Sequence, residues 1–347
     1  MTSLPIRPIV QNQAEAKEDV PDLSYISQPI GDLFGSLPTD PSSYTQYQLD
    51  AEQIQFYKEN GYLINIKVLS EEQCDRILED YKKFLLWDQN DITTQAGSMN
   101  DAHRISHPGM HLFHEFHSNQ TNDPDNVLSH MLGHWRITPL FHDLIFHPAI
   151  TVPSSQLLAS ANSDGRSMVP VQFWHDQLFA KPPHHGANVA WHQDYSYWTR
   201  TIPMNHMTVH IALDEQTLEN GTLHFIPKSH KWTRDNGHPL PVTDFDFKDM
   251  ESIKTILTAE EKEQFKPVPS LLKKGYASFH HPLMVHGSYP NRTSLPRRAA
   301  VVNYFGQGTK SNTDESLLLN VPVIKKGELI TGRFFPLVFD PAWLEAK

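Results

Sequence analysis

The stretch Trp191-His192-Gln193-Asp194-Tyr195 decides how the rest of the chain is interpreted. It continues a short apolar run that begins at Val189 and is typical of a β-strand. In an extended segment the side chains at positions i and i+2 share a face, so His192 and Asp194 can point at one metal ion. In a chain with 21 histidines a lone His-x-Asp triplet arises by chance roughly once, and such a histidine can equally be an ordinary one. The pair therefore needs a third ligand.

A second stretch, His286-Gly287-Ser288, supplies the candidate. A second histidine from a distant strand would complete a 2-His-1-carboxylate facial triad, which leaves coordination positions open for a cosubstrate and oxygen. His280 and His281 compete for this role, but they precede Pro282 at the end of a strand. We favour His286, because a glycine that permits a tight turn, a serine and a Pro-Asn turn follow it.

Arg297 follows His286 at the start of another predicted strand, with Arg298 beside it. A dicarboxylate bound to iron at one end needs a cation at the other, and the planar fork of arginine meets a carboxylate with two parallel hydrogen bonds. Alternation along a strand lets only one of the two arginines face inward. The alternative is that both are solvated charges, which we accept for Arg298. Ser288 could add a hydroxyl contact to the same carboxylate.

Composition limits the possible classes. The 347 residues carry a net charge of −11, with 39% hydrophobic and 20% charged residues, as expected of a globular protein that does not bind nucleic acid. The single cysteine, Cys74, excludes an internal disulfide. We find no apolar run long enough to span a membrane, no signal core and no peroxisomal address. These features predict a cytoplasmic protein.

The N-terminal half is predicted to be helical after an extended arm. Residues 1–49 hold six prolines and are interpreted as a flexible arm. A single catalytic domain is expected over 50–347, with helices over 50–150. The expected helices are Asp50–Gly61, Ser70–Trp87, Asn126–Trp135 and Pro139–His147, with a strand over Tyr62–Ile66 and a loop over Asp88–Thr121.

From about residue 165 the pattern changes to short strands bounded by Gly, Pro and Asn. The expected strands are Val169–Lys181, Val189–His192, Met207–Leu213, Thr222–Ile226, Tyr276–Phe279 and Arg298–Phe305. Together they predict a mainly β fold with a jelly-roll core over about 165–310. A polar insertion at about 240–270 contains a short helix at Thr258–Phe265, and such an insertion often contributes to a lid.

The block Glu219–His230, which contains Asn-Gly and Ile-Pro-Lys-Ser-His, carries a resemblance together with the motifs above. In order and spacing, from about Gln53 to Phe305, the chain resembles the phytanoyl-CoA dioxygenase family of iron(II)- and 2-oxoglutarate-dependent oxygenases, whose core is a double-stranded β-helix. The resemblance implies that His192, Asp194 and His286 bind iron. It implies that Arg297 and Ser288 bind 2-oxoglutarate, and that Lys181 of the Lys-Pro-Pro segment borders that pocket. His210 stands where relatives often carry a tryptophan.

The resemblance further implies Fe²⁺, 2-oxoglutarate and O₂ as cofactors and cosubstrates, with ascorbate as an assay reductant. The expected reaction hydroxylates an aliphatic C–H bond of a small organic or lipid-like substrate and releases succinate and CO₂. The alternatives are another metal-dependent cupin-type enzyme or a non-catalytic binding protein that keeps the fold. Neither the substrate nor the oligomeric state can be read from the sequence.

Overall fold

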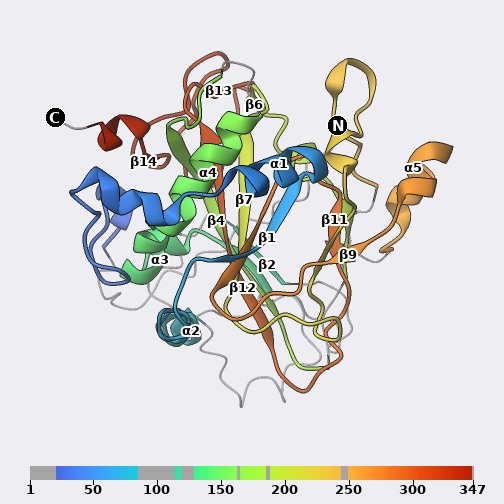
Figure 1. Cartoon of the computed structure of the whole chain (residues 1–347), viewed down its shortest axis with the longest axis horizontal. Helices are drawn as coiled ribbons and strands as arrows, with labels where there is room; N and C mark the ends of the chain where they lie inside the picture. The colour runs from blue at the N-terminus through green and yellow to red at the C-terminus, as the bar shows by residue number, and fades with distance from the viewer. Residues whose placement is uncertain are drawn as a thin grey trace, which may run out of the picture.

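A computed structural model describes residues 21–84, 112, 115–118, 129–161, 165–184, 188–243 and 249–345. Its core is two facing antiparallel sheets (Figure 1). The larger sheet has the strand order β1-β10-β7-β12-β4-β3-β2, with β14 paired to β4, and the smaller has the order β5-β11-β8-β9. Side-chain contacts such as Lys181 to Ser288 join the two, so the predicted jelly-roll core with flanking helices is confirmed.

The larger sheet is built around the two long strands β4 and β12, which pair along their lengths. Its strands are β1 (Tyr62–Lys67), β2 (Glu115–Ser118), β3 (Ser129–Leu132), β4 (Val171–Lys181), β7 (His206–Ala212), β10 (Tyr276–His280), β12 (Arg297–Gly306) and β14 (Leu337–Phe339). Every residue of β7 is buried, because helices cover one face of this sheet and the smaller sheet covers the other.

The smaller sheet carries the two motifs of the site. Its strands are β5 (Val189–His192), β8 (Leu223–Phe225), β9 (Val268–Pro269) and β11 (His286–Ser288). In the register of β5 and β11, His192 and His286 are direct partners. A separate two-stranded sheet pairs β6 (Thr201–Ile202) with β13 (Lys310–Ser311).

The helices lie mainly on the outer face of the larger sheet (Figure 1). They are α1 (Ala51–Asn60), α2 (Glu71–Phe84), α3 (Pro139–Leu144), α4 (Pro148–Ser160) and α5 (Ala259–Gln264), with 3₁₀ turns η1 (Leu23–Tyr25), η2 (Pro41–Tyr47), η4 (His134–Arg136), η5 (Asp194–Ser196), η6 (Ser229–Lys231), η7 (Asp235–Gly237), η8 (Ser252–Thr255) and η9 (Pro341–Leu344). Asp50 and Gln53 form the capping box of α1, and Gly61 ends it in a left-handed conformation. Among the described helices, none has the length and apolar character needed to cross a bilayer.

Two local predictions are wrong. The helix expected near Asn126–Trp135 is the strand β3 followed by η4, because the backbone of β3 pairs with β2 on one side and β4 on the other. The loop expected over Asp88–Thr121 contains β2, and most of the rest of that range lies outside the described residues. In both cases pairing with distant segments outweighs the local pattern.

The described part of the N-terminal segment packs on the domain. Residues 21–49 lie on the helical face, where Leu33, Tyr44 and Leu49 belong to the main hydrophobic core. The Asp143 carboxylate accepts hydrogen bonds from the backbone N–H groups of residues 30, 31 and 33. Residues 1–20 lie outside the described range, and the division into arm and domain stays a prediction.

The insertion follows the prediction in its helix, since α5 begins with a capping box between Thr258 and Glu261. Met250, Ile253 and Leu257 pack against Trp191 in one hydrophobic cluster. Trp191 precedes His192, so its side chain points to the opposite face of β5. The described part of the insertion therefore backs the smaller sheet from outside; residues 244–248 lie outside the described range, and a lid role stays a prediction.

Candidate metal centre and cosubstrate pocket

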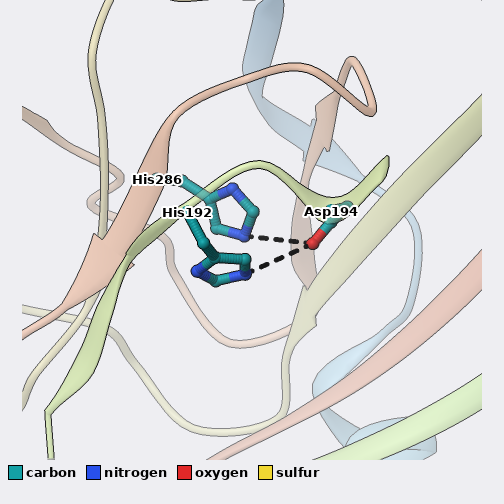
Figure 2. Close-up of side chains that lie close together, drawn as sticks. All are labelled: His192, Asp194 and His286. Atoms are coloured by element: carbon teal, nitrogen blue, oxygen red, sulfur yellow. Dashed lines mark ion pairs between the residues drawn. The ribbon is translucent and has the colours of Figure 1, made fainter. Parts of the chain in front are cut away.

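The end of β5, the start of η5 and the start of β11 bring His192, Asp194 and His286 together (Figure 2). One ligand atom from each lies within 4.8 Å of the others. The Nε2 atoms of His192 and His286 lie 3.4 Å and 3.5 Å from Oδ1 of Asp194. Three such ligands grouped on one side are the donor set that a facial triad requires.

Backbone carbonyls fix the orientation of both imidazoles. Nδ1 of His192 lies 2.8 Å from the carbonyl oxygen of Ala190, and Nδ1 of His286 lies 2.9 Å from that of Met284. Each Nδ1 therefore carries the proton and donates it, which leaves the lone pair of Nε2 facing the metal position. Burial lowers the pKa of His286 to about 3, so its ring is neutral and available as a ligand at neutral pH.

The Asp194 carboxylate is ionised and held in one orientation. Burial alone would raise its pKa, but the surrounding His286, His192 and His280 outweigh burial and hold the pKa well below the usual range. Oδ1 faces the two histidine ligands. Oδ2 accepts a 2.6 Å hydrogen bond from the Thr208 hydroxyl and lies 3.2 Å from Nε2 of His280. The two carboxylate oxygens thus have different tasks.

Gln193, the residue between the ligands, holds the turn in place, which the sequence did not indicate. Its side chain is buried and points away from the metal position. The amide donates to the carbonyls of Trp232 and Leu283 and accepts from the N–H of Leu240. A fully bonded amide at this position fixes the backbone angle between His192 and Asp194.

The competing histidines are separated by the fold. His280, on β10, contacts the far oxygen of Asp194, and its ring lies 4.5 Å from the His286 ring at a tilt of 52°. His281 packs against His230. Neither joins the three-residue group that could hold a metal, as only His286 lies opposite His192 in the strand register.

Two buried basic side chains lie side by side between the sheets, and one of them contacts Ser288 on the strand that begins with His286. Arg297 and Lys181 are direct partners across β12 and β4, and both side chains are fully buried. The Lys181 ammonium donates to the hydroxyl of Ser288 at 2.6 Å and to the carbonyl of Tyr289. Burial and then the nearby Arg297 hold the pKa of Lys181 well below its usual value.

The Arg297 guanidinium has fewer hydrogen-bond acceptors around it than it has N–H donors. Its Nη2 donates to the Gly221 carbonyl at 2.7 Å, whereas its buried Nε has no hydrogen-bond partner within the part of the chain that the structure describes. Burial lowers its pKa to about 10, so it stays charged at neutral pH. No carboxylate of the described residues pairs with Arg297 or Lys181, and a carboxylate ligand would satisfy both.

Arg298 points to the opposite face of β12 from Arg297, as the alternation of side chains along a strand predicts. Its guanidinium forms two hydrogen bonds with the Asp214 carboxylate on the outside of the barrel. His210 lies on the inner face and pairs with Gln216. Burial, with Arg297 nearby, keeps the pKa of His210 well below its usual value, so it contributes a neutral ring.

The facing sheets, the His-Asp-His group and the buried arginine are the architecture of the iron(II)- and 2-oxoglutarate-dependent oxygenases. The family model for phytanoyl-CoA dioxygenase matches residues 57–299. The chain belongs to the phytanoyl-CoA dioxygenase family.

Individual relatives match more locally. The chain is 36% identical over 39% of its length to the phytanoyl-CoA dioxygenase domain-containing protein 1 homolog of Caenorhabditis briggsae, of which the match covers 46%. It is 26% identical over 48% of its length to L-proline trans-4-hydroxylase of Streptomyces griseoviridis, covering 63% of that protein. The Bos taurus phytanoyl-CoA dioxygenase domain-containing protein 1 is 28% identical over 72% of this chain and is covered to 88%. The chain thus spans less than two thirds of the length of the Caenorhabditis briggsae and Streptomyces griseoviridis proteins.

Solved structures share the fold at low sequence identity. The α-ketoglutarate-dependent carbocyclase SnoK from nogalamycin biosynthesis superposes with a TM-score of 0.60 at 19% identity, over 88% of this chain and 100% of that one. The epimerase SnoN, solved with Fe³⁺, α-ketoglutarate and nogalamycin RO, superposes with a TM-score of 0.60 at 17% identity, over 86% of this chain and 100% of SnoN. These similarities establish the fold.

Proposed function

We propose that this protein is an iron(II)- and 2-oxoglutarate-dependent dioxygenase that hydroxylates an aliphatic C–H bond of a small organic or lipid-like molecule. His192, Asp194 and His286 would hold the iron. Arg297, with Ser288 and Lys181 beside it, would hold the distal carboxylate of 2-oxoglutarate. The family membership supports the class of reaction, and the geometry of this chain supports the residue roles.

The observation that carries the proposal is the buried, charged Arg297 guanidinium, which has no carboxylate partner among the described residues and lies beside the buried amino group of Lys181. Burying an unpaired guanidinium costs several kcal/mol, so a fold keeps it only where a ligand compensates it. A dicarboxylate bound at the metal through its other end supplies that compensation. A cupin-type enzyme without this cosubstrate has no use for Arg297 and Lys181.

Iron(II) and 2-oxoglutarate, when bound, supply the activation of O₂ that is coupled to oxidative decarboxylation. In the balanced reaction one oxygen atom enters succinate and the other enters the substrate: R–H, 2-oxoglutarate and O₂ give R–OH, succinate and CO₂. The protein would contribute three oriented metal ligands, a carboxylate clamp and the aromatic ring of Tyr197, which lies 5.7 Å from the His192 ring and would limit access of water.

Asp194 supports hydroxylation over halogenation within this class. The resemblance to the family implies that halogenating relatives lack the carboxylate and bind a halide in its place. In this chain the carboxylate is present, ionised and held through both oxygens. Ring closure and epimerisation, the activities named for two proteins of similar fold, remain outcomes that product analysis would distinguish.

The direct test measures 2-oxoglutarate binding and uncoupled succinate release with iron(II) and ascorbate. We expect Arg297→Met to weaken 2-oxoglutarate binding roughly 100-fold, because it removes charge-assisted hydrogen bonds worth about 3 kcal/mol. Arg298→Met is the matched control and should bind 2-oxoglutarate like wild type, since Arg298 pairs with Asp214 outside the pocket. A wild-type protein that releases no succinate, together with an Arg297→Met variant of unchanged affinity, would favour a different cupin-type enzyme or a non-catalytic binding protein.

The substrate can be sought by comparing metabolites consumed by the wild type and by an Asp194 variant. Products that carry one added oxygen atom, derived from ¹⁸O₂, would establish hydroxylation. Products that lose two hydrogen atoms without gaining oxygen would instead establish desaturation or ring closure.

A further inference from the structure

The far oxygen of Asp194 begins a line of hydrogen-bonded side chains that crosses the larger sheet. The Thr208 hydroxyl lies 2.6 Å from Oδ2 of Asp194, and the amide nitrogen of Asn303 lies 2.9 Å from the Thr208 oxygen. The amide nitrogen of Gln177 lies 2.6 Å from the Asn303 carbonyl oxygen. Nε2 of His130 lies 2.7 Å from the Gln177 carbonyl oxygen. We call these four residues the relay.

The direction of every bond in the relay follows from the carboxylate at its end. An ionised carboxylate only accepts, so Thr208 must donate to it and must accept from the Asn303 NH₂ group. The Asn303 carbonyl then accepts from Gln177, and the Gln177 carbonyl accepts from Nε2–H of His130. Turning over either amide would break two hydrogen bonds, so the relay has one stable arrangement.

The strand register explains how these residues meet. The relay takes one residue from each of the adjacent strands β7, β12, β4 and β3. Thr208 is the direct partner of Asn303 on one side and of His280 on the other, and His280 is the second group against Oδ2 of Asp194. A β-bulge between Asn303 and Tyr304 changes the pairing with β4 at this point, which suits a side chain that must be aimed at a site.

The stability of the fold does not explain why polar side chains occupy the relay positions. Thr208 and Asn303 are buried at 4% and 0% exposure, among strands whose other inward positions accept apolar residues such as Val301. Polar groups buried in a sheet contribute little net stability compared with apolar residues of similar size. Their common feature is that the bonds end on one oxygen of one metal ligand.

We propose that Thr208, supported by Asn303 and Gln177, is a positioning residue for the metal centre: it holds Oδ2 of Asp194 away from the metal so that Oδ1 alone is a ligand. The inference rests on the proposed function only in assuming that the triad binds a divalent metal. A freely rotating carboxylate could bind through both oxygens and occupy a position that the cosubstrate or O₂ needs. The relay keeps that position open.

The test measures Co²⁺ binding to the full chain in the absence of 2-oxoglutarate. Calorimetry gives the affinity, and the visible absorption spectrum of the bound ion reports its coordination number. Thr208→Val keeps the shape and removes the hydroxyl. We expect it to raise the Kd for Co²⁺ at least about 10-fold, the usual effect of removing a partner of a metal ligand, and to change the Co²⁺ spectrum. Thr208→Ser keeps the hydroxyl and should restore both to within about threefold of wild type.

The matched control is Thr309→Val. Thr309 is also buried, and its hydroxyl donates to the Gly306 carbonyl at 2.8 Å, a bond that is not part of the relay. Its loss should leave Co²⁺ affinity and spectrum unchanged. A second variant, Gln177→Met, acts at a half-buried position three hydrogen bonds from the Asp194 carboxylate, and should raise the Kd by about threefold.

The outcomes separate the two proposals. Wild-type affinity and spectrum in both Thr208→Val and Gln177→Met would overturn the positioning role, while succinate release by the wild type would leave the dioxygenase assignment intact. A wild-type chain that binds no divalent metal would overturn both. If Thr208→Val does not fold, a wild-type Co²⁺ spectrum in Gln177→Met alone would overturn the relay.

Discussion

At the scale of single residues, the site depends on which atom of each side chain is free. Both histidines of the candidate triad use Nδ1 to bond the carbonyl of the residue two positions earlier, Ala190 and Met284, and so present Nε2. The repeated pattern arises because both histidines lie in extended segments with the same local geometry. The sequence predicted the identities of these residues, whereas the choice of nitrogen follows from backbone contacts.

Replacing the carboxylate ligand tests the triad directly. We expect Asp194→Ala to weaken iron binding by at least about 100-fold, more than the loss of a partner of a ligand, and to reduce succinate release to background. The measurement is anaerobic Fe²⁺ titration together with a succinate assay. Asp214→Ala, which removes a carboxylate outside the barrel, serves as the control. Unchanged iron affinity in Asp194→Ala would remove it from the ligand set.

At the scale of elements, the spacing of the ligands depends on the pairing of β5 with β11. Gly287 follows His286, and a Cβ at that position would lie 2.8 Å from the carbonyl oxygen of Val189 and 2.9 Å from Met250. The Val189 oxygen belongs to the backbone of β5 and cannot move without shifting the strand that ends in His192. Glycine is therefore required here by close approach of two strands.

Gly287→Ala should separate the two strands and lower the stability of the metal-free protein by about 1–3 kcal/mol, the usual cost of overpacking. Urea unfolding would measure this loss. Gly306→Ala on β12 is a useful comparison, since its Cβ would meet the end of the Asn205 side chain, which can rotate away. We expect the smaller loss there, and equal losses in both variants would contradict a rigid contact at Gly287.

The elements also show where a local pattern fails. α4 was not anticipated, because nearly all its residues are buried and its sequence has no polar stripe to set a helical period. β3 was interpreted as a helix, because only its neighbours β2 and β4 make it extended. By contrast, the capped helices α1 and α5 carry their end signals in the sequence, and both were predicted.

At the scale of the whole molecule, the N-terminal segment is attached to the catalytic domain by charged groups as well as by apolar contacts. The Asp22 carboxylate forms two hydrogen bonds with the buried Arg136 guanidinium, the shorter at 2.6 Å. Burial opposes ionisation of Asp22, but the hydrogen bonds from Arg136 and Ser24 outweigh it and lower its pKa to about 2. This contact joins residues more than a hundred positions apart.

The stability that Asp22 contributes should depend on pH. Its pKa in the folded state, about 2, lies below the ordinary aspartate value of 3.8, so the unfolded chain binds more protons between these values and stability rises with pH. The contribution, about 2 kcal/mol in full above pH 5, should fall by about 1 kcal/mol by pH 3. Urea unfolding of wild type and Asp22→Asn at both pH values would show the two converging. Asp32→Asn, which makes the same charge change in the same segment without touching the contact between Asp22 and Arg136, serves as the control.

The sequence by itself determined the candidate residues of the site and the order in which they occur: a His-x-Asp pair at the end of a strand, a later histidine followed by glycine, and a pair of arginines of which alternation lets one face inward. These follow from local periodicity and side-chain chemistry, which short segments carry on their own. The tertiary structure decided which histidine stands opposite His192, that Lys181 and Arg297 are neighbours, and that Thr208, Asn303 and Gln177 lead to Asp194. Those relations depend on strand register between segments far apart in the chain, and register is fixed only when both sheets pack their inner faces together.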